Sequence, residues 1–413
     1  MKRKVIGVLL SVAMAATLLT GCGTNKDSGA ADNAQATEES PAAEEGQEEG
    51  TAEGEEEAVG SVGIDKEDLK VGFVHIGDPS DMGYTYNHDQ GTKKMQEAIG
   101  LTDDQIVNKF NTPEDAECDT ALRELVDAGC NIIFGTSFGF EDYMLEVAKE
   151  YPDVQFCHST GYQAASSGLA NMHNYFTSIY QARYLSGIAA GKKTESNKLG
   201  YVAAFPYAEV ISGFTSFYLG AKSVNPDVTM EIQYTNSWND PKKEAEVAQA
   251  LIDNGCDVIS QHSDSTAPAT TAEKNGVWQA GYNADTISAA PKASLVSACI
   301  DWSIYLTEAV QAVIDGEEIP VDWCQGLSED GSQDAVYLSP LNTDIIAEGT
   351  QEAIDEATEK IRAGELDVFA GPLKGVSPEG EEYEVKEGDH FPEQEEVSAP
   401  SWSYIVDGCT VVE

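Results

Sequence analysis

Short apolar runs alternate with helical patterns along most of the chain. The β-branched run at residues 71–76 predicts a buried strand, and the Gly, Asp and Pro residues after it end that strand. From about residue 86 the pattern becomes helical, with Gly91, Met95 and Ile99 four residues apart on one face. This pattern is one strand, loop and helix unit of a parallel sheet. Ligands collect beyond the carboxyl ends of the strands in such sheets, so we expect binding chemistry at residues 78–89.

The same unit recurs near residue 200. A strand is predicted at residues 199–205, followed by a polar loop at 206–209 and a helix whose small and apolar residues face inward. Residues 122–137 and 248–263 resemble each other, because each joins a helix to a strand through a Gly. This alternation predicts an α/β fold with parallel sheets covered by helices on both faces. Two similar beginnings indicate two lobes, and a cleft between lobes is typical of a receptor that closes over a small solute.

The two ends of the chain are predicted to lie outside this body. Residues 1–22 have a basic start, an apolar centre and small residues near the end, which is typical of a secretory signal. The final LTGC resembles a bacterial lipobox, so we expect Cys22 to carry a lipid anchor, with a plain signal peptide as the alternative. Residues 23–66 are acidic and poor in large apolar side chains, which predicts a disordered tether. At the C-terminus we expect a hairpin near residues 378–380 and a tail held by Trp402.

The charge and the cysteines exclude several classes of function. A net charge of −48 excludes a nucleic-acid partner bound through its phosphates, because that recognition needs a basic surface. The seven cysteines other than Cys22 show no CxxC spacing, so neither a disulfide framework nor a zinc site is expected, and most should be small core residues. The sequence contains no catalytic, metal or phosphate-binding motif that we recognise, so we expect no catalysis and no cofactor.

A few titratable residues could be drawn as catalytic pairs. His88 lies beside Asp89, and His262 lies two residues before Asp264. No nucleophile accompanies either pair, so a structural or ligand-binding role is expected for both. Glu141 and Asp142 come just after Gly139 and are predicted to begin a solvated helix turn, where acidic residues are favoured.

Aromatic, amide and carboxylate side chains gather at the predicted strand ends. Flat aromatic walls with a few hydrogen-bonding groups suit a planar, nitrogen-rich ring, although sugars also stack on aromatic rings. The predicted ligand-binding residues are Tyr84, Tyr86, Asp89, Ser137, Phe138, Tyr162, Phe205, Glu209, Asn236, Trp238, Asp264, Asp285 and Trp302.

Several stretches resemble the BMP (basic membrane protein) family of ABC-transporter solute-binding lipoproteins, which are relatives of the purine nucleoside receptor. They include GDPSDMGYTYNHDQG, GTSFGFEDYMLEVAKEYPDVQF, GYVAAFPYAEVISGFTSFYLGAKSVNPD, NSWNDPKKEAEVAQALIDNGCDVISQHSDSTAP and APKASLVSACIDWSIY, and the resemblance covers residues 69–375. It implies a periplasmic-binding-protein type I fold, in which two doubly wound parallel-sheet lobes are joined by a three-crossing hinge. The crossings are expected near residues 174–181, 296–301 and 325–328.

These crossings define the expected domains. Lobe 1 comprises residues 67–176 and 300–325, and lobe 2 comprises residues 177–299 and 326–375. The C-terminal hairpin and tail comprise residues 376–413.

The resemblance also implies a ligand. Purine nucleoside receptors of the family are similar in having a Lys that reaches the ribose, shortly after the strand matched by LVSACID. Here Cys299, Ile300, Asp301 and Trp302 stand at those positions, which argues against ribose recognition. The Trp-bearing strand, with NSW and HSDS, resembles a subgroup that takes a free purine base such as adenine. A neutral base gains stacking on both faces, and acidic groups accept its exocyclic amine.

The expected function is therefore an extracytoplasmic, lipid-anchored receptor that delivers a purine base to an ABC permease and its ATPase. The expected stacking groups are Tyr84 or Tyr86 with Phe205 or Trp302, and the expected edge groups are Asp89, Ser137, Asn236, Asp264 and Asp285. The alternatives are a purine nucleoside, another small solute such as a sugar, a flavin or a signalling molecule, and an added role as a surface antigen or adhesin. A lipid-anchored nucleoside hydrolase is the remaining alternative, but GDPSDMG lacks the third nearby Asp that a calcium-dependent hydrolase needs.

Overall fold

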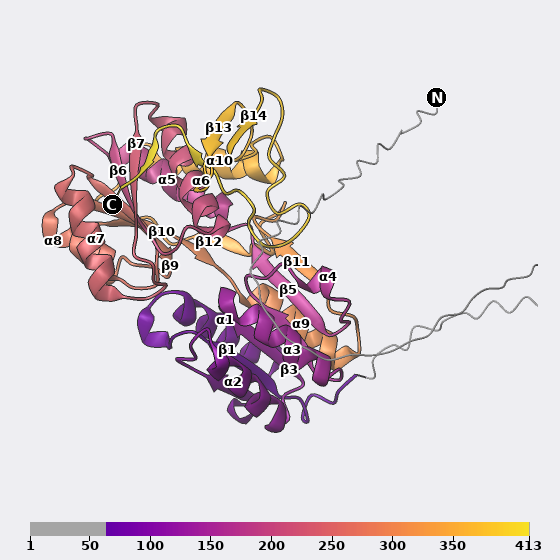
Figure 1. The fold of residues 1–413 in the computed structure, drawn as a ribbon. Helices are drawn as coiled ribbons and strands as arrows, with labels where there is room; N and C mark the ends of the chain where they lie inside the picture. The colour runs from indigo at the N-terminus through magenta and orange to yellow at the C-terminus, as the bar shows by residue number, and fades with distance from the viewer. Residues whose placement is uncertain (1–62, 413) are drawn as a thin grey trace, which may run out of the picture. The chain divides into compact units, whose positions relative to one another are not determined.

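The computed structural model describes residues 63–412 (Figure 1). The predicted signal segment, the predicted lipidation site Cys22 and nearly all of the predicted tether lie outside these residues. The described chain contains a six-stranded sheet, called sheet 1 below, a seven-stranded sheet, called sheet 2, and a small three-stranded sheet.

Sheet 1 is parallel throughout. Its strands, from edge to edge, are β11 (Asp322–Gln325), β5 (Met172–Thr177), β4 (Gln155–His158), β3 (Ile132–Thr136), β1 (Val71–His75) and β2 (Ile106–Lys109). Successive side chains of a strand point to opposite faces. Phe73 packs in the cluster formed with α1 (Tyr84–Ile99) and α9 (Ser303–Asp315), whereas Val74 packs with α2 (Ala116–Asp127) and α3 (Glu141–Glu150). Both faces are therefore covered by helices.

Sheet 2 repeats this arrangement. Its strands are β12 (Val336–Leu338), β10 (Ser294–Ile300), β9 (Trp278–Asn283), β8 (Val258–His262), β6 (Lys198–Ala203), β7 (Thr229–Tyr234) and β16 (Cys409–Val411). All pairs are parallel except β10 with β12. Tyr201 packs in the cluster formed with α5 (Ile179–Lys193), α6 (Ala208–Val224) and α10 (Thr350–Arg362), and Val202 packs with α7 (Pro241–Asp253) and α8 (Ala267–Asn275).

Short helices lie in the connections of sheet 1. They are η1 (Pro79–Asp81), η2 (Asp103–Gln105), η3 (Phe138–Phe140) and α4 (Ala164–Ser167).

The chain passes between sheet 1 and sheet 2 three times, after β5, between β10 and β11, and after β11. The predicted fold class, two doubly wound parallel sheets joined by three crossings, is confirmed; the residue boundaries given for the domains stay a prediction. Helix α1 begins at Tyr84, two residues earlier than predicted. Its first turn is capped from outside the helix, because the Asp81 carboxylate accepts the backbone N–H groups of Gly83, Thr85 and Tyr86 at 2.8–3.0 Å.

A second difference concerns the loop after the first strand of sheet 2. That strand, β6, ends at Ala203, and α6 begins at Ala208, so the helix already includes the end of the loop predicted at residues 206–209. A four-residue polar stretch and the first turn of a helix share the same residue types, so their boundary is poorly specified by composition.

The C-terminal residues form strands as well as a tail. The predicted hairpin is confirmed, since β13 (Leu373–Val376) and β14 (Glu382–Val385) pair antiparallel. Two further strands were not predicted: β15 (Ile405–Val406) pairs with β13, and β16 extends sheet 2 beside β7. Segments of two or three residues carry no detectable periodicity, which is why the sequence gives no sign of them.

The segment that leads to Trp402 contacts elements of both large sheets. The Glu393 carboxylate accepts the Ser212 hydroxyl of α6 at 2.5 Å and the Trp402 backbone N–H at 2.7 Å. Five residues further on, the Ser398 backbone N–H donates to Oδ1 of Asp322 in β11 at 2.8 Å. The C-terminal segment is thus tied to α6 of sheet 2 and to the edge strand of sheet 1.

Replacing Trp402 with Ala is expected to lower the free energy of unfolding by about 3–5 kcal/mol, the usual cost of removing a buried Trp side chain. The Trp402 side chain is 0% exposed and stacks on Phe369 with the ring centroids 5.2 Å apart. Urea denaturation followed by circular dichroism measures the change. The control Val411→Ala, at an exposed position of β16, should shift stability by less than about 0.5 kcal/mol. A loss for Trp402→Ala no larger than the control's would contradict the packing described here.

Candidate functional site

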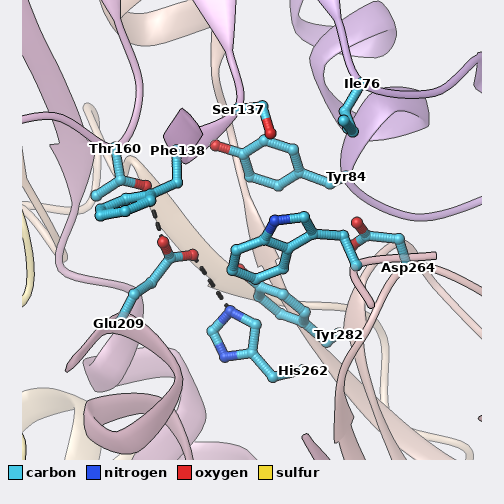
Figure 2. Close-up of a pocket in the computed structure, with 10 residues that line it drawn as sticks. Ile76, Tyr84, Ser137, Phe138, Thr160, Glu209, His262, Asp264 and Tyr282 are labelled. Atoms are coloured by element: carbon cyan, nitrogen blue, oxygen red, sulfur yellow. Dashed lines mark hydrogen bonds and ion pairs between the residues drawn. The ribbon is translucent and has the colours of Figure 1, made fainter. Parts of the chain in front are cut away.

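A pocket is lined by residues at or beyond the carboxyl ends of the strands of both large sheets (Figure 2). Residues that lie in or after strands of sheet 1 are Ile76, Tyr84, Ser137, Phe138 and Thr160; those of sheet 2 are Glu209, Trp238, His262, Asp264 and Tyr282. The pocket is therefore built jointly by the two sheets.

The two halves of the pocket are in direct contact. The Thr160 hydroxyl, beyond β4, donates to Oε2 of Glu209 on α6 at 3.0 Å, a bond drawn as a dashed line in Figure 2. Where α1 begins, a Cβ on Gly83 would lie only 2.3 Å from the backbone oxygen of Asp264. Only a glycine allows this approach. The backbone at Gly83, from the sheet 1 half, therefore packs directly against the backbone of Asp264, from the sheet 2 half.

Stacked aromatic rings also connect the sheet 1 half of the pocket to the sheet 2 half. Tyr207 stacks on Phe138 from the sheet 1 half and on Phe205 from the sheet 2 half, each with ring centroids 5.2 Å apart. Phe205 in turn meets Trp238 edge to face at 5.0 Å. Phe138 and Trp238 line the pocket, whereas Phe205 supports Trp238 from behind. The arrangement presents flat ring surfaces to the pocket with little freedom to rotate.

The sheet 1 half of the pocket is held by hydrogen bonds to side chains beneath it. The Tyr84 hydroxyl lies 2.8 Å from Oγ of Ser159, and burial raises the pKa of Tyr84 well above its usual value of 10.0, so the phenol is neutral. Nε2 of His158 donates to the backbone oxygen of Ser137 at 2.7 Å, which fixes the turn before Phe138.

Glu141 is not the solvated helix residue predicted from the sequence. Its side chain is buried, with the residue 4% exposed, and Oε1 accepts the backbone N–H groups of Tyr162 and Gln163 at 2.8 Å and the Asn174 amide at 2.9 Å. A buried carboxylate needs such donors to offset the loss of water. These bonds fix the loop after β4, which carries Thr160.

In the sheet 2 half, Glu209 and His262 form the central polar pair. Nε2 of His262 lies 3.2 Å from Oε1 of Glu209, and Figure 2 shows both groups on the pocket side of their elements. Burial, together with the positive charge of Arg183, lowers the pKa of His262 from 6.5 to about 4. At pH 7 the imidazole is therefore neutral and donates its Nε2 proton to the carboxylate.

Asp264 supplies the second carboxyl group of the pocket. Burial, with the negative charges of Asp81, Glu244 and Glu209 nearby, raises the pKa of Asp264 well above its usual value of 3.8. Its Oδ1 accepts the Asn283 amide at 3.2 Å. A carboxyl that keeps its proton to higher pH can both donate and accept a hydrogen bond, which suits a heterocycle with a donor beside an acceptor.

The structure brings together about half of the predicted site residues. Those in the pocket lining are Tyr84, Ser137, Phe138, Glu209, Trp238 and Asp264. Those outside the lining are Tyr86, Asp89, Tyr162, Phe205, Asn236, Asp285 and Trp302.

The residues outside the lining have other surroundings. Trp302 is 1% exposed and packs behind Tyr84, with the ring centroids 5.8 Å apart. Asp89 pairs with Lys93 at 2.5 Å on the same helix, and the Asp285 carboxylate accepts the backbone N–H of Ile287. Tyr162 is 53% exposed. Tyr162, Asp285 and Trp302 follow strand ends in sequence, whereas Asp89 lies within α1, and contacts with other parts of the chain hold their side chains outside the pocket lining.

Tyr86 and Asn236 lie outside the lining as well. Tyr86 is half-buried on α1, two residues after Tyr84 and so on the opposite side of the helix, and Asn236 is exposed, with a positive φ of 53°. That backbone conformation belongs to a turn and directs the chain after β7 toward Trp238.

Four lining residues were not among the predicted ligand-binding residues, although His262 was expected to have a structural or ligand-binding role. They are Ile76, Thr160, His262 and Tyr282. His262 is the last residue of β8 and Tyr282 the last but one of β9, while Ile76 and Thr160 follow β1 and β4 by one and two residues. The rule that ligands lie at strand ends, applied to every predicted strand and to every residue type, would have found all four.

Residues 63–412 include seven cysteines, all free, of which Cys118, Cys130, Cys157, Cys256 and Cys299 are buried as predicted. Within the same range, no group of three or more His, Cys, Asp or Glu side chains is placed to hold a metal ion. No helix among these residues is long and apolar enough to cross a membrane.

The two sheets, the crossings between them and a pocket lined from both define a two-lobed solute-binding protein. Residues 69–366 match the family model of Bmp, described as ABC transporter substrate-binding protein PnrA-like. The chain belongs to the Bmp family of ABC-transporter substrate-binding proteins, and it is a solute receptor, not an enzyme. As the substrate-binding protein of an ABC transporter, it acts outside the cytoplasm.

Individual relatives support this assignment. A purine-binding protein of Brucella abortus is 38% identical over 331 residues, which is 80% of this chain and 90% of the relative. A putative ABC transporter glucose-binding protein of Haloferax volcanii is 34% identical over 360 residues, 87% of this chain and 88% of the relative. A solute-binding protein structure from Aeropyrum pernix has a TM-score of 0.61 at 17% identity, covering 75% of this chain and 94% of that one, and supports the fold.

Replacing His262 with Gln is expected to remove part of the acid sensitivity of the fold. Because the folded-state pKa of about 4 lies below the unfolded value of 6.5, the unfolded chain binds a proton in this window that the folded chain does not. The free energy of unfolding therefore falls as pH drops from 6.5 to 4. Between pH 7 and pH 5, wild type should lose about 2 kcal/mol more than His262→Gln.

Urea denaturation of both proteins at the two pH values measures this difference. The exposed His390, paired with Glu395 at 3.0 Å, gives a matched control, since His390→Gln should leave the difference between the two pH values close to that of wild type. An equal loss in wild type and His262→Gln would show that His262 is not held neutral.

Proposed function

We propose that this protein captures a purine base, with adenine as the best-fitting ligand, and delivers it to an ABC permease and its ATPase. The base lies in the pocket between the two sheets, with aromatic rings against its faces and carboxyl groups at its edges. No bond of the ligand is made or broken.

The observation that carries this proposal is the combination of side chains in the lining. Tyr84, Phe138, Trp238 and Tyr282 provide ring surfaces, and Glu209 and Asp264 provide carboxyl groups. Adenine offers two π-faces, an exocyclic amine that donates and ring nitrogens that accept, so each kind of lining group has a partner on it. The 38% identity to a purine-binding protein supports the same ligand class.

Two features favour a base over a nucleoside or nucleotide. None of the ten lining residues is Lys or Arg, so a phosphate would meet only acidic and neutral groups. Lys94 of α1 donates to Oδ2 of Asp301, the residue after β10, at 2.7 Å. This lysine is therefore engaged in an ion pair and is not free to bind a ribose.

Isothermal titration calorimetry with adenine, adenosine and glucose tests the ligand. Adenine should bind most tightly, and Trp238→Ala should weaken adenine binding by about 1–3 kcal/mol, the usual worth of stacking a base on an aromatic ring. The matched control is Trp278→Ala at the amino end of β9, where the indole lies under Lys193 Nζ at 3.9 Å and outside the pocket lining. The control should leave adenine affinity unchanged.

A second candidate ligand is a sugar. The relative named as a putative glucose-binding protein is 34% identical over most of this chain, and aromatic rings also stack on pyranose faces. Tight binding of glucose without binding of adenine would replace the purine proposal with this one.

The proposal includes a lipid anchor at Cys22. The LTGC sequence and the basic, apolar segment before it support export and lipidation. In a bacterial host, wild type should be recovered in the membrane fraction, and Cys22→Ser should lose the lipid and appear at a correspondingly lower mass. Cys118→Ser, at a buried core cysteine, is the control and should stay membrane-bound. Equal membrane recovery and equal lipid content for Cys22→Ser and wild type would contradict the anchor.

A further inference from the structure

Arg183 lies behind the sheet 2 half of the pocket, on helix α5. The residue is 1% exposed, and its guanidinium carbon lies 3.5 Å from the centre of the Tyr282 ring. Arg183 does not line the pocket, whereas Tyr282 does. The guanidinium occupies one face of this ring, so the pocket is left the opposite face and the edge of Tyr282.

The same guanidinium joins three neighbouring strands of sheet 2. Nη1 donates to the Tyr201 hydroxyl of β6 and to the backbone oxygen of Gln261 in β8, both at 2.6 Å, while the ring it covers belongs to β9. Gln261 immediately precedes His262, whose ring centre is 4.7 Å from that of Tyr282. Arg183 thus contacts the ring of Tyr282 itself and the backbone of the residue that precedes His262.

This position is costly for the folded state. Among residues 63–412, no Asp or Glu forms an ion pair with Arg183, and its Nε and Nη2 groups have no hydrogen-bond partner. The Tyr282 ring and two neutral acceptors return part of the hydration energy that a buried cation loses, but no carboxylate among the described residues returns the rest. Even buried ion pairs can often be replaced by apolar residues of similar volume without loss of stability, and Arg183 has no ion-pair attraction within residues 63–412 to lose.

We propose that Arg183 is a positioning residue of the binding pocket, which fixes the Tyr282 ring and the strand end that carries His262 at the expense of fold stability. An apolar side chain in the same place would pack against Tyr282 but would release the Gln261 backbone oxygen. The Tyr282 ring and the end of β8 would then no longer be held in the binding geometry before the ligand binds, and ordering them would cost part of the binding free energy.

The double variant Arg183→Met/Tyr201→Phe separates this role from an ordinary structural one. It removes the cation and the hydroxyl that depends on it, so no new unpaired group is left at Tyr201. The melting temperature should be equal to or above that of wild type. Affinity for adenine should fall by about tenfold or more, as is usual when a supporting residue behind a site is removed. A structural residue would lose stability and affinity together.

Hydrogen exchange on the ligand-free full chain gives a readout that does not depend on the ligand. Peptides covering residues 261–265 and 282–285 should exchange faster in the double variant, while those from sheet 1 stay unchanged. The choice of adenine rests on the proposed function, but the exchange result does not. If wild type fails to bind adenine, the ligand proposal fails and Arg183 is still tested by exchange and stability.

Two single variants complete the test. Arg183→Lys keeps the charge but lacks the planar group, and it should weaken adenine binding nearly as much as the double variant. Leu185→Met, at a buried position of the same helix, should change neither affinity nor exchange at residues 261–265. Wild-type exchange in the double variant, or a fall in melting temperature with exchange that rises throughout the chain, would overturn the proposal.

Discussion

The parallel pairing of strands is the constraint on which the pocket depends. In a parallel sheet the carboxyl ends of neighbouring strands lie at one edge, about 5 Å apart, so residues far apart in sequence become neighbours there. The register Ala203 with His262 in sheet 2, and His75 with Thr136 in sheet 1, sets these ends level with each other. A lining residue one or two positions beyond a strand is then placed by the sheet, before any contact to a ligand exists.

The polar groups around the pocket differ in how well the protein compensates their burial. Glu141 accepts three N–H groups of the surrounding chain, and His262 has the Glu209 carboxylate as acceptor. Arg183 receives much less in return. Well-compensated groups stabilise the walls, whereas a poorly compensated group lowers stability and persists only where it contributes to function. A rigid pocket contains both kinds of buried polar group: those with enough hydrogen-bond partners to stabilise the fold, and a few that lower its stability but hold the pocket residues in place.

More of the fold than of the binding site could be predicted from the sequence. Strands such as residues 71–76 show their apolar pattern in one continuous run, and the repeat of helix, Gly and strand at Gly129 and Gly255 reveals the second sheet, because both signals are local. The direction of a side chain after a strand depends on loop length and on contacts from other elements. Trp302 and Asp285 therefore could not be told from Trp238 and Asp264 by residue type and position alone. Burial of Glu141 depends on donors from a different loop, which no local pattern records.

The C-terminal segment adds a constraint that the family match does not include, since that match ends at residue 366. Glu393 is tied to Ser212 on α6, and Ser398 is tied to Asp322 on β11, at the edge of sheet 1 beside two of the crossings. The two attachment points, Glu393 and Ser398, are five residues apart in sequence and contact elements of different sheets. A rotation of sheet 1 against sheet 2 about the crossings changes the distance between the attachment points. The two hydrogen bonds and the segment that joins them therefore lie across the crossings about which such a rotation would occur.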